Sequence, residues 1–242
     1  MYGSKQQFTP KTNIIPNINQ VVILHVQVIV CAMMYYARGV DNKLLMTISS
    51  IGTQQDTATE GTVAAIRQLL NYVATYPNNG IIYRTSDMIL CARSNAAYLN
   101  ESKSRSQAGS FIFLSEDNAI PRLNGPVLVL AQIIKFFMSS FAESELAGVF
   151  ITAKKMIPFC QTLIEMAWPQ PKLPILTDNS TTDGVTNRTS IAKKIKSMYM
   201  RLWWLQCRES QGQFRIYWAS GSRNKSYCPT KHHPKIYHET KC

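Results

Sequence analysis

Apolar residues follow different spacings on the two sides of residue 80. Before it, residues 21–36 form the most hydrophobic run, and the segment 59–76 repeats its apolar positions near the 3.6-residue period of a helix. These positions are Val63, Ile66, Leu70, Val73 and Tyr76. Residues 77–80 read Pro-Asn-Asn-Gly, a turn sequence that is expected to end the helix. The pattern predicts a mainly helical unit, preceded by a lead of residues 1–20 that lacks a periodic apolar face and is expected to be flexible.

After residue 80 the pattern becomes typical of strands. Three apolar, β-rich runs at 87–99, 108–116 and 125–134 are separated by polar or Gly/Pro residues, which favours an antiparallel meander. A helical pattern then begins near Ser140, and Pro158 is expected to kink or interrupt it. The predicted apolar face of this helix is Leu146, Val149, Phe150, Ala153, Ile157, Cys160, Ile164 and Ala167.

The remaining pattern predicts a strand at 174–178, an amphipathic helix at 193–209 and a strand at 213–220. Together with the meander, this order predicts an α/β fold in which flanking helices cover a mixed sheet. Tyr199, Trp203 and Trp204 lie in the second helix among cations, and they could stack on nucleic-acid bases. Aromatic residues at helical spacing are more often core, and the core interpretation is favoured for them and for Trp218.

Charge adds a candidate partner to this picture. The 242-residue chain has a net charge of +12, and residues 191–242 hold 11 Lys and Arg against two Glu. Such a block favours a polyanion, usually nucleic acid or an anionic membrane surface, because neutralised phosphates release counterions. A solvated basic tail remains the alternative.

Two further features bear on the cellular environment. The apolar run 21–36 spans 16 positions, fewer than the roughly 20 that cross a bilayer, so a buried helix or strand is favoured over a membrane anchor. The six cysteines are spread without Cys-x-x-Cys pairs, and most lie in apolar segments. We therefore expect reduced thiols and an intracellular protein without membrane contact.

The strand at 174–178 ends on Asp178, which Asn179 follows. Such a pair can simply form a turn, because both side chains hydrogen-bond their own backbone. Strand ends of α/β sheets are also where ligands usually lie, and Glu143 and Glu145 at the start of the preceding helix could supply further carboxylates. Carboxylates that converge from separate elements suit divalent cations such as Mg²⁺.

Several motifs resemble the ribonuclease H region that closes Copia-type retrotransposon polyproteins. They are SNAAYLNESKSRSQAGSFIFLSE (94–116), MSSFAESELAGVFITAKK (138–155), ILTDNSTTDGV (175–185), KKIKSMYMRLWWLQCRESQGQFRIYW (193–218) and TKHH (230–233). The resemblance covers residues 83–235, and residues 21–82 are similar to the thumb and connection of the associated reverse transcriptase. A ribonuclease H-like domain at 83–235, a thumb-like segment at 21–82 and a tail at 236–242 are therefore expected, in a chain that looks like a truncated fragment.

The resembled family uses four acidic positions to hold two Mg²⁺ or Mn²⁺ ions over an RNA/DNA hybrid. Glu145, with the companion Glu143, and Asp178 match two of these positions. The other two are replaced, because Asn95 stands in the Ser-Asp-Ala motif and Tyr227 in the last motif. The resemblance thus implies that Glu145 and Asp178 are the remaining metal ligands, with Asn95 a poor third.

This replacement predicts an impaired or inactive nuclease, because the affinity of a cation site depends on the number of charged ligands. RNA/DNA hybrid or another nucleic acid is the expected partner. The expected phosphate contacts are Lys193, Lys194, Lys196, Arg201, Arg215, Arg223 and Lys231. A nucleic-acid-binding module without catalysis, and a decayed product without function, remain open alternatives.

Overall fold

A computed structural model describes residues 19–101, 104–118, 121–190, 198–221 and 224–230. The expected lead up to residue 18 and the tail 236–242 lie outside these ranges, as do five of the expected phosphate contacts. Those five are Lys193, Lys194, Lys196, Arg223 and Lys231.

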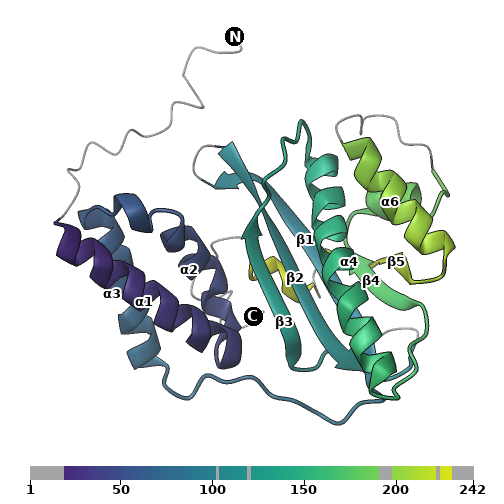
Figure 1. The fold of residues 1–242 in the computed structure, drawn as a ribbon, viewed down its shortest axis with the longest axis horizontal. Helices are drawn as coiled ribbons and strands as arrows, with labels where there is room; N and C mark the ends of the chain where they lie inside the picture. Colours follow the sequence, from purple (N-terminus) through teal and green to yellow (C-terminus); the bar gives the residue numbers. More distant parts are fainter. Residues whose placement is uncertain (1–18, 102–103, 119–120, 191–197, 222–223, 231–242) are drawn as a thin grey trace.

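Five strands form one mixed sheet in the order β3-β2-β1-β4-β5 (Figure 1). The strands β1 (Ile89–Glu101), β2 (Arg105–Ser115) and β3 (Pro126–Ile133) are antiparallel neighbours, as the three apolar runs predicted. The strands β4 (Leu173–Thr177) and β5 (Phe214–Trp218) add parallel to β1. The predicted mixed sheet is therefore confirmed, with its antiparallel and parallel halves joined at β1.

The helices of this half are α4 (Phe141–Glu165), α5 (Ser180–Thr186) and α6 (Tyr199–Ser210). Leu146, Val149 and Ala153 of α4 are fully buried in the core that the helix forms with β1 and β2, as predicted. The predicted interruption at Pro158 is wrong, because α4 continues for seven residues beyond it. Ile164 is also not part of the buried face, because the preceding residue, Leu163, is buried in the core instead.

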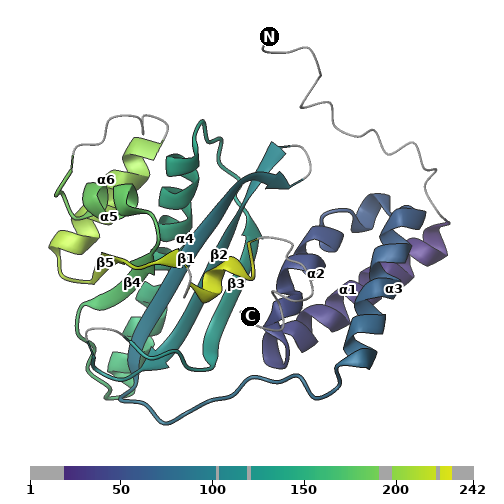
Figure 2. The same cartoon turned by 180° about the vertical axis from the view of Figure 1, so that it is seen from behind.

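Helices α1 (Gln20–Gly39), α2 (Leu45–Gly52) and α3 (Glu60–Thr75) precede the sheet. They share a buried apolar cluster with Val129 of β3, so this helical unit packs against the sheet beside β3 (Figures 1 and 2). On α3 the buried residue is Leu69 rather than the predicted Leu70. The two positions are 100° apart on a helix, and tertiary packing decides which of them faces the core.

The first helix is longer than the apolar run suggested. An 18-residue stretch of this 20-residue helix has a mean hydropathy of 1.7, and by length and composition the helix could cross a membrane. One face, carrying Ile23, Val26 and Val30, is nevertheless buried against the neighbouring helices. Gln27 also donates a hydrogen bond to Asp56 at 3.1 Å. The predicted packing as a buried helix is confirmed for this face.

The cysteines differ from the expectation at one position. Cys31, Cys91, Cys160 and Cys207 are free, whereas Cys228 is disulfide-bonded. The prediction of reduced thiols is wrong for Cys228, because its spacing along the chain does not reveal which thiols meet after folding. Burial in β1 raises the pKa of the Cys91 thiol to about 12, with the nearby Asp117 adding to the shift.

Candidate functional site

The parallel pairing of β1 with β4 brings Asn95 near the end of β4, which Asp178 follows. The register pairs Ala92 with Ile175 and Arg93 with Leu176, and its continuation by two residues brings Asn95 beside Asp178. Ser94 faces α4, where its hydroxyl accepts a hydrogen bond from Thr152 at 3.2 Å. Because side chains alternate along a strand, Asn95 faces the opposite side of the sheet.

That opposite side is covered by residues 224–230, which we call the C-terminal cover. It contains the short helix η6 (Lys225–Tyr227), which crosses the sheet in front of β1 and β2 (Figure 2). The amide of Asn95 donates to the Thr230 hydroxyl at 2.6 Å, and both residues are buried. Only 1% of Asn95 is exposed, so the position where the resembled family has its first acid is closed to solvent.

Further hydrogen bonds attach the cover to β1. Asn100 donates to the Thr230 carbonyl at 2.8 Å, and Asn224 donates to the Ser94 carbonyl at 3.1 Å. Gly109, the cross-strand partner of Asn95, makes room for this contact. A Cβ atom on Gly109 would lie 2.4 Å from Thr230 Cγ2 and 2.7 Å from the Ser226 carbonyl oxygen. The cover therefore packs on the sheet as closely as a glycine permits.

Glu143 and Glu145 lie at the first turns of α4, and each is 1% exposed. Glu143 accepts hydrogen bonds from the backbone amide and the hydroxyl of Ser139, at 2.7 and 2.9 Å. These bonds show that the companion acid fixes the loop before the helix. Gly148, one turn after Glu145, packs against β1, where an added Cβ atom would lie 3.2 Å from the Asn95 carbonyl oxygen. The first turns of α4, which carry Glu145, therefore pack closely on the backbone of β1.

Asp178 directly follows β4 and is half-buried. Its carbonyl accepts a hydrogen bond from the indole of Trp218 at 3.1 Å. The next residue, Asn179, begins α5, because its side chain accepts the Thr182 amide at 2.9 Å. Asn179 therefore caps α5 through its side chain, and Asp178 stands directly before this cap.

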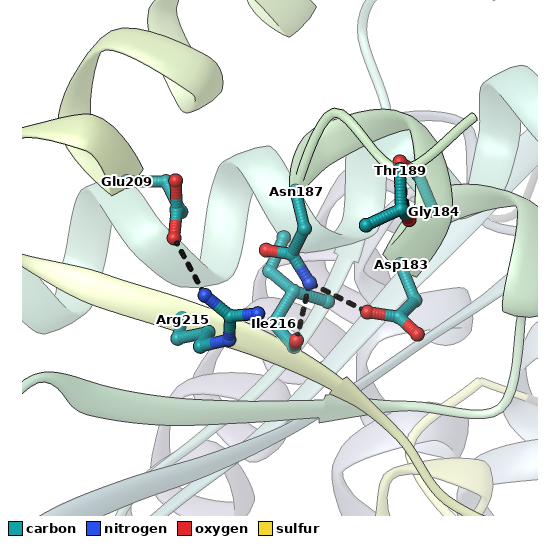
Figure 3. Close-up of polar contacts among 7 residues, drawn as sticks. All are labelled: Asp183, Gly184, Asn187, Thr189, Glu209, Arg215 and Ile216. Atoms are coloured by element: carbon teal, nitrogen blue, oxygen red, sulfur yellow. Dashed lines mark hydrogen bonds and ion pairs between the residues drawn. The ribbon is translucent and has the colours of Figure 1, made fainter. Parts of the chain in front are cut away.

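A second acid, Asp183, belongs to the packing of α5 on β5 (Figure 3). The Asn187 amide bridges the Asp183 carboxylate at 2.6 Å and the Ile216 carbonyl at 2.7 Å. Burial raises the pKa of the Asp183 carboxyl, while the Asn187 hydrogen bond and the Arg215 charge lower it by smaller amounts. Arg215, an expected phosphate contact, forms an ion pair with Glu209 at 3.4 Å.

The donor set does not fit two metal ions. In the part of the chain that the structure describes, no three His, Cys, Asp or Glu side chains lie together in a way that could hold a metal. The Asn95 amide is engaged by Thr230, and Glu143 is engaged by Ser139. The backbone of Tyr227 belongs to the cover, so this replaced position does lie on the Asn95 side of the sheet.

The sequence pattern missed two groups of residues. Tyr199 and Trp203 were interpreted as core but are 62% and 55% exposed, because Leu202 and Leu205 form the buried face of α6. Trp218 was also interpreted as core but is 56% exposed at the end of β5. Trp204 is packed against the core as predicted. Thr230 and Gly109 were not identified as partners of Asn95. Their only sequence signal is the presence of Thr230 within a resembled motif.

Comparisons with known proteins connect this geometry to solved structures. No protein-family model and no curated protein matches the chain. The foamy viral protease-reverse transcriptase in complex with dsDNA is 12% identical, with a TM-score of 0.50, over 82% of this chain and 38% of that chain. This chain therefore spans less than half the length of that protein.

Two ribonuclease H structures cover most of their own length. The N-terminal RNase H domain of rv2228c from Mycobacterium tuberculosis is 13% identical, covers 57% of this chain and 86% of its own, and gives a TM-score of 0.40. LC11-RNase H1 in complex with RNA/DNA hybrid is 8% identical, with 56% and 88% coverage and a TM-score of 0.42. At these identities the likeness concerns the fold alone. The strand order, the mixed sheet and its flanking helices show that this chain has a ribonuclease H-like fold.

Proposed function

We propose that the chain is a ribonuclease H-like domain that binds RNA/DNA hybrid and has lost efficient cleavage. The observation that carries this proposal is Asn95, which replaces the first acid and is buried beneath the C-terminal cover. A full negative charge is missing at that position, and solvent or substrate reaches it only if the cover moves. Glu145 and Asp178 remain as candidate ligands for one Mg²⁺ or Mn²⁺ ion, too few for the two-ion arrangement.

The origin of the domain is part of the same proposal. The motif order supports a remnant of a Copia-type retrotransposon polyprotein, with a thumb-like segment at 21–82 and the ribonuclease H-like domain at 83–235. The foamy viral match supports this division, because it extends beyond the sheet to 82% of this chain. We further propose an intracellular location and no membrane contact for the folded chain.

Binding without catalysis is the form of this function that the charge favours. The net charge of +12 attracts a nucleic acid, and the lysines at 193, 194 and 196 would contact its phosphates. The two replaced acids lower the affinity for metal ions, which disfavours catalysis. A decayed product without any function would have no selective affinity for a hybrid duplex, and this property distinguishes it from a nucleic-acid-binding module.

Hybrid binding should depend steeply on salt. We expect the logarithm of the affinity for a labelled RNA/DNA hybrid to fall linearly with the logarithm of the salt concentration, by about 0.9 per phosphate contact. Substituting Gln at Lys193, Lys194 and Lys196 should lower the affinity and reduce the slope by about 3. Fluorescence anisotropy at several salt concentrations measures both quantities.

A matched control removes the same charge from the helical unit, with Gln at Arg38, Lys43 and Arg67. Its slope should stay close to that of the unmodified chain. Equal effects of the two triple substitutions would mean that only net charge matters. Salt-independent binding, or no binding at all, would contradict the proposed function.

A further inference from the structure

The region between α4 and α6 carries cations that lie over aromatic rings. The guanidinium of Arg201 is 3.8 Å from the centroid of the Phe136 ring and 5.9 Å from that of Phe150. Lys154 Nζ lies 5.6 Å from the Phe150 centroid. The Phe150 and Trp204 rings meet edge to face at 5.2 Å. Packing thus holds these cations at the surface in fixed positions.

These cations have no carboxylate partner among the described residues. Arg208 completes the group, with its guanidinium 5.5 Å from the Trp204 ring. The ion pair in this half of the molecule is Arg215 with Glu209, and it does not include Lys154, Arg201 or Arg208. Three cations are therefore available to an external anion, and their ring contacts reduce the entropy lost on binding.

Exposed aromatic side chains lie beside this group. Tyr199, Met200 and Trp203 of α6 are 62%, 77% and 55% exposed. Leu202 and Leu205 hold the opposite face of α6 in the core, so exposure of these side chains does not result from a loosely attached helix. Tyr199 and Trp203 are four residues apart and therefore neighbours on the helix surface.

We propose that this α4–α6 surface, made of Lys154, Arg201, Arg208, Tyr199, Met200 and Trp203, binds an unpaired nucleic-acid strand. Bases would stack on the exposed aromatic rings, and phosphates would contact the three cations. In the sequence, three lysines at 193, 194 and 196 directly precede α6 and add positive charge to the same segment. This combination of free cations and exposed rings favours a single strand over a duplex, whose bases are already stacked.

The position of the surface suits a strand that leaves the candidate site. Phe150 and Lys154 follow Glu145 on α4 by five and nine residues, which corresponds to about 7 to 14 Å along the helix axis. A single-stranded extension of a hybrid bound near Glu145 would therefore reach the surface within a few nucleotides. The inference rests on the proposed function only where it takes the ligand to be a hybrid with a single-stranded extension.

The test compares two labelled probes by fluorescence anisotropy. The probes are an oligothymidine of about 12 nucleotides and a blunt RNA/DNA hybrid of about 12 base pairs. Combined Tyr199→Ala and Trp203→Ala substitutions should raise the Kd for oligothymidine by about tenfold or more, since each stacked base contributes a large share of the affinity. The Kd for the blunt hybrid should change by less than about threefold.

The matched control is Tyr35→Ala, which removes an 85% exposed aromatic side chain from α1. It should leave both Kd values unchanged. A double variant that binds oligothymidine as tightly as the unmodified chain would overturn the inference, while salt-dependent binding of the hybrid would preserve the proposed function. Oligothymidine binding without hybrid binding would support the surface and contradict the proposed function.

An acidic peptide is the competing occupant of such a surface. Polyglutamate of matched charge should displace oligothymidine poorly, because it offers no bases that stack. Displacement at equal concentration would show a general anion site and would contradict the assignment to nucleic acid. Failure of the unmodified chain to bind oligothymidine would also overturn it.

Discussion

Replacing Asn95 by aspartate is expected to lower the free energy of unfolding by about 2 to 3 kcal/mol near pH 7. Asn95 is 1% exposed, and its amide donates to the Thr230 hydroxyl. A carboxylate there would lose its hydration. Arg93, two residues earlier on the same face of β1, would offset part of this cost.

The effect should depend on pH in a defined direction. Burial raises the pKa of a carboxyl at this position above its unfolded value of about 3.9. The variant should therefore match the unmodified chain below about pH 4, where a neutral carboxyl can still donate to Thr230. Its stability should fall as the pH rises through the folded pKa. Urea denaturation followed by circular dichroism across this range measures the difference.

Asn100→Asp provides the matched control. Asn100 is exposed and donates to the carbonyl of the same residue, Thr230. Losing this hydrogen bond should cost about 1 kcal/mol or less, with little dependence on pH. If both variants lost the same stability near neutral pH, Asn95 would be accessible to solvent, contrary to the structure.

The second large effect is expected for Gly109→Ala. The added Cβ atom would lie 2.4 Å from Thr230 Cγ2, 2.7 Å from the Ser226 carbonyl oxygen and 3.0 Å from Pro229 Cγ. Because one of these atoms belongs to the backbone, the C-terminal cover has to move away from the sheet. We expect a loss of about 2 to 3 kcal/mol, typical of an overpacked core.

Movement of the cover can be measured separately from global stability. Lys225 lies in the cover, so trypsin should cleave there faster in the Gly109→Ala variant than in the unmodified chain. Gly61→Ala serves as the control, because its Cβ atom would meet only Thr59 Oγ1 at 3.6 Å. An unchanged cleavage rate together with unchanged stability would show that the cover is not packed on Gly109.

The strands and their antiparallel meander followed from the sequence because each strand is an apolar run bounded by polar or Gly/Pro residues. Glu145 and Asp178 could be identified from the sequence for a similar reason, since local motifs mark a helix start and a strand end. The hydrogen-bond partner of Asn95 could not be predicted from the sequence, because Thr230 is 135 positions away and only the folded sheet brings the two residues together. Asn95 was therefore interpreted as a weak metal ligand, whereas the structure shows a buried hydrogen-bond donor.

The exposed face of α6 illustrates a different limit. Helical periodicity predicted an amphipathic helix at 193–209, and Met198, Leu202 and Leu205 are its buried residues. Tyr199 follows Met198 directly and was interpreted as core, although it is 62% exposed. The period of a pattern gives the direction of a buried face but not its width, because the width depends on which elements pack against the helix. Aromatic residues at such an edge could belong to the core or to a binding surface.

The measurement that tests the central claim most directly is cleavage of a labelled RNA/DNA hybrid in the presence of Mg²⁺ or Mn²⁺. The account predicts that the unmodified chain binds the hybrid in a salt-dependent manner and does not cleave it. Parallel reactions contain Asp178→Asn and a double variant with Asn95→Asp and Tyr227→Asp. Cleavage by the unmodified chain that Asp178→Asn abolishes would contradict the account, because it would show a working metal site in which Asn95 is not closed off.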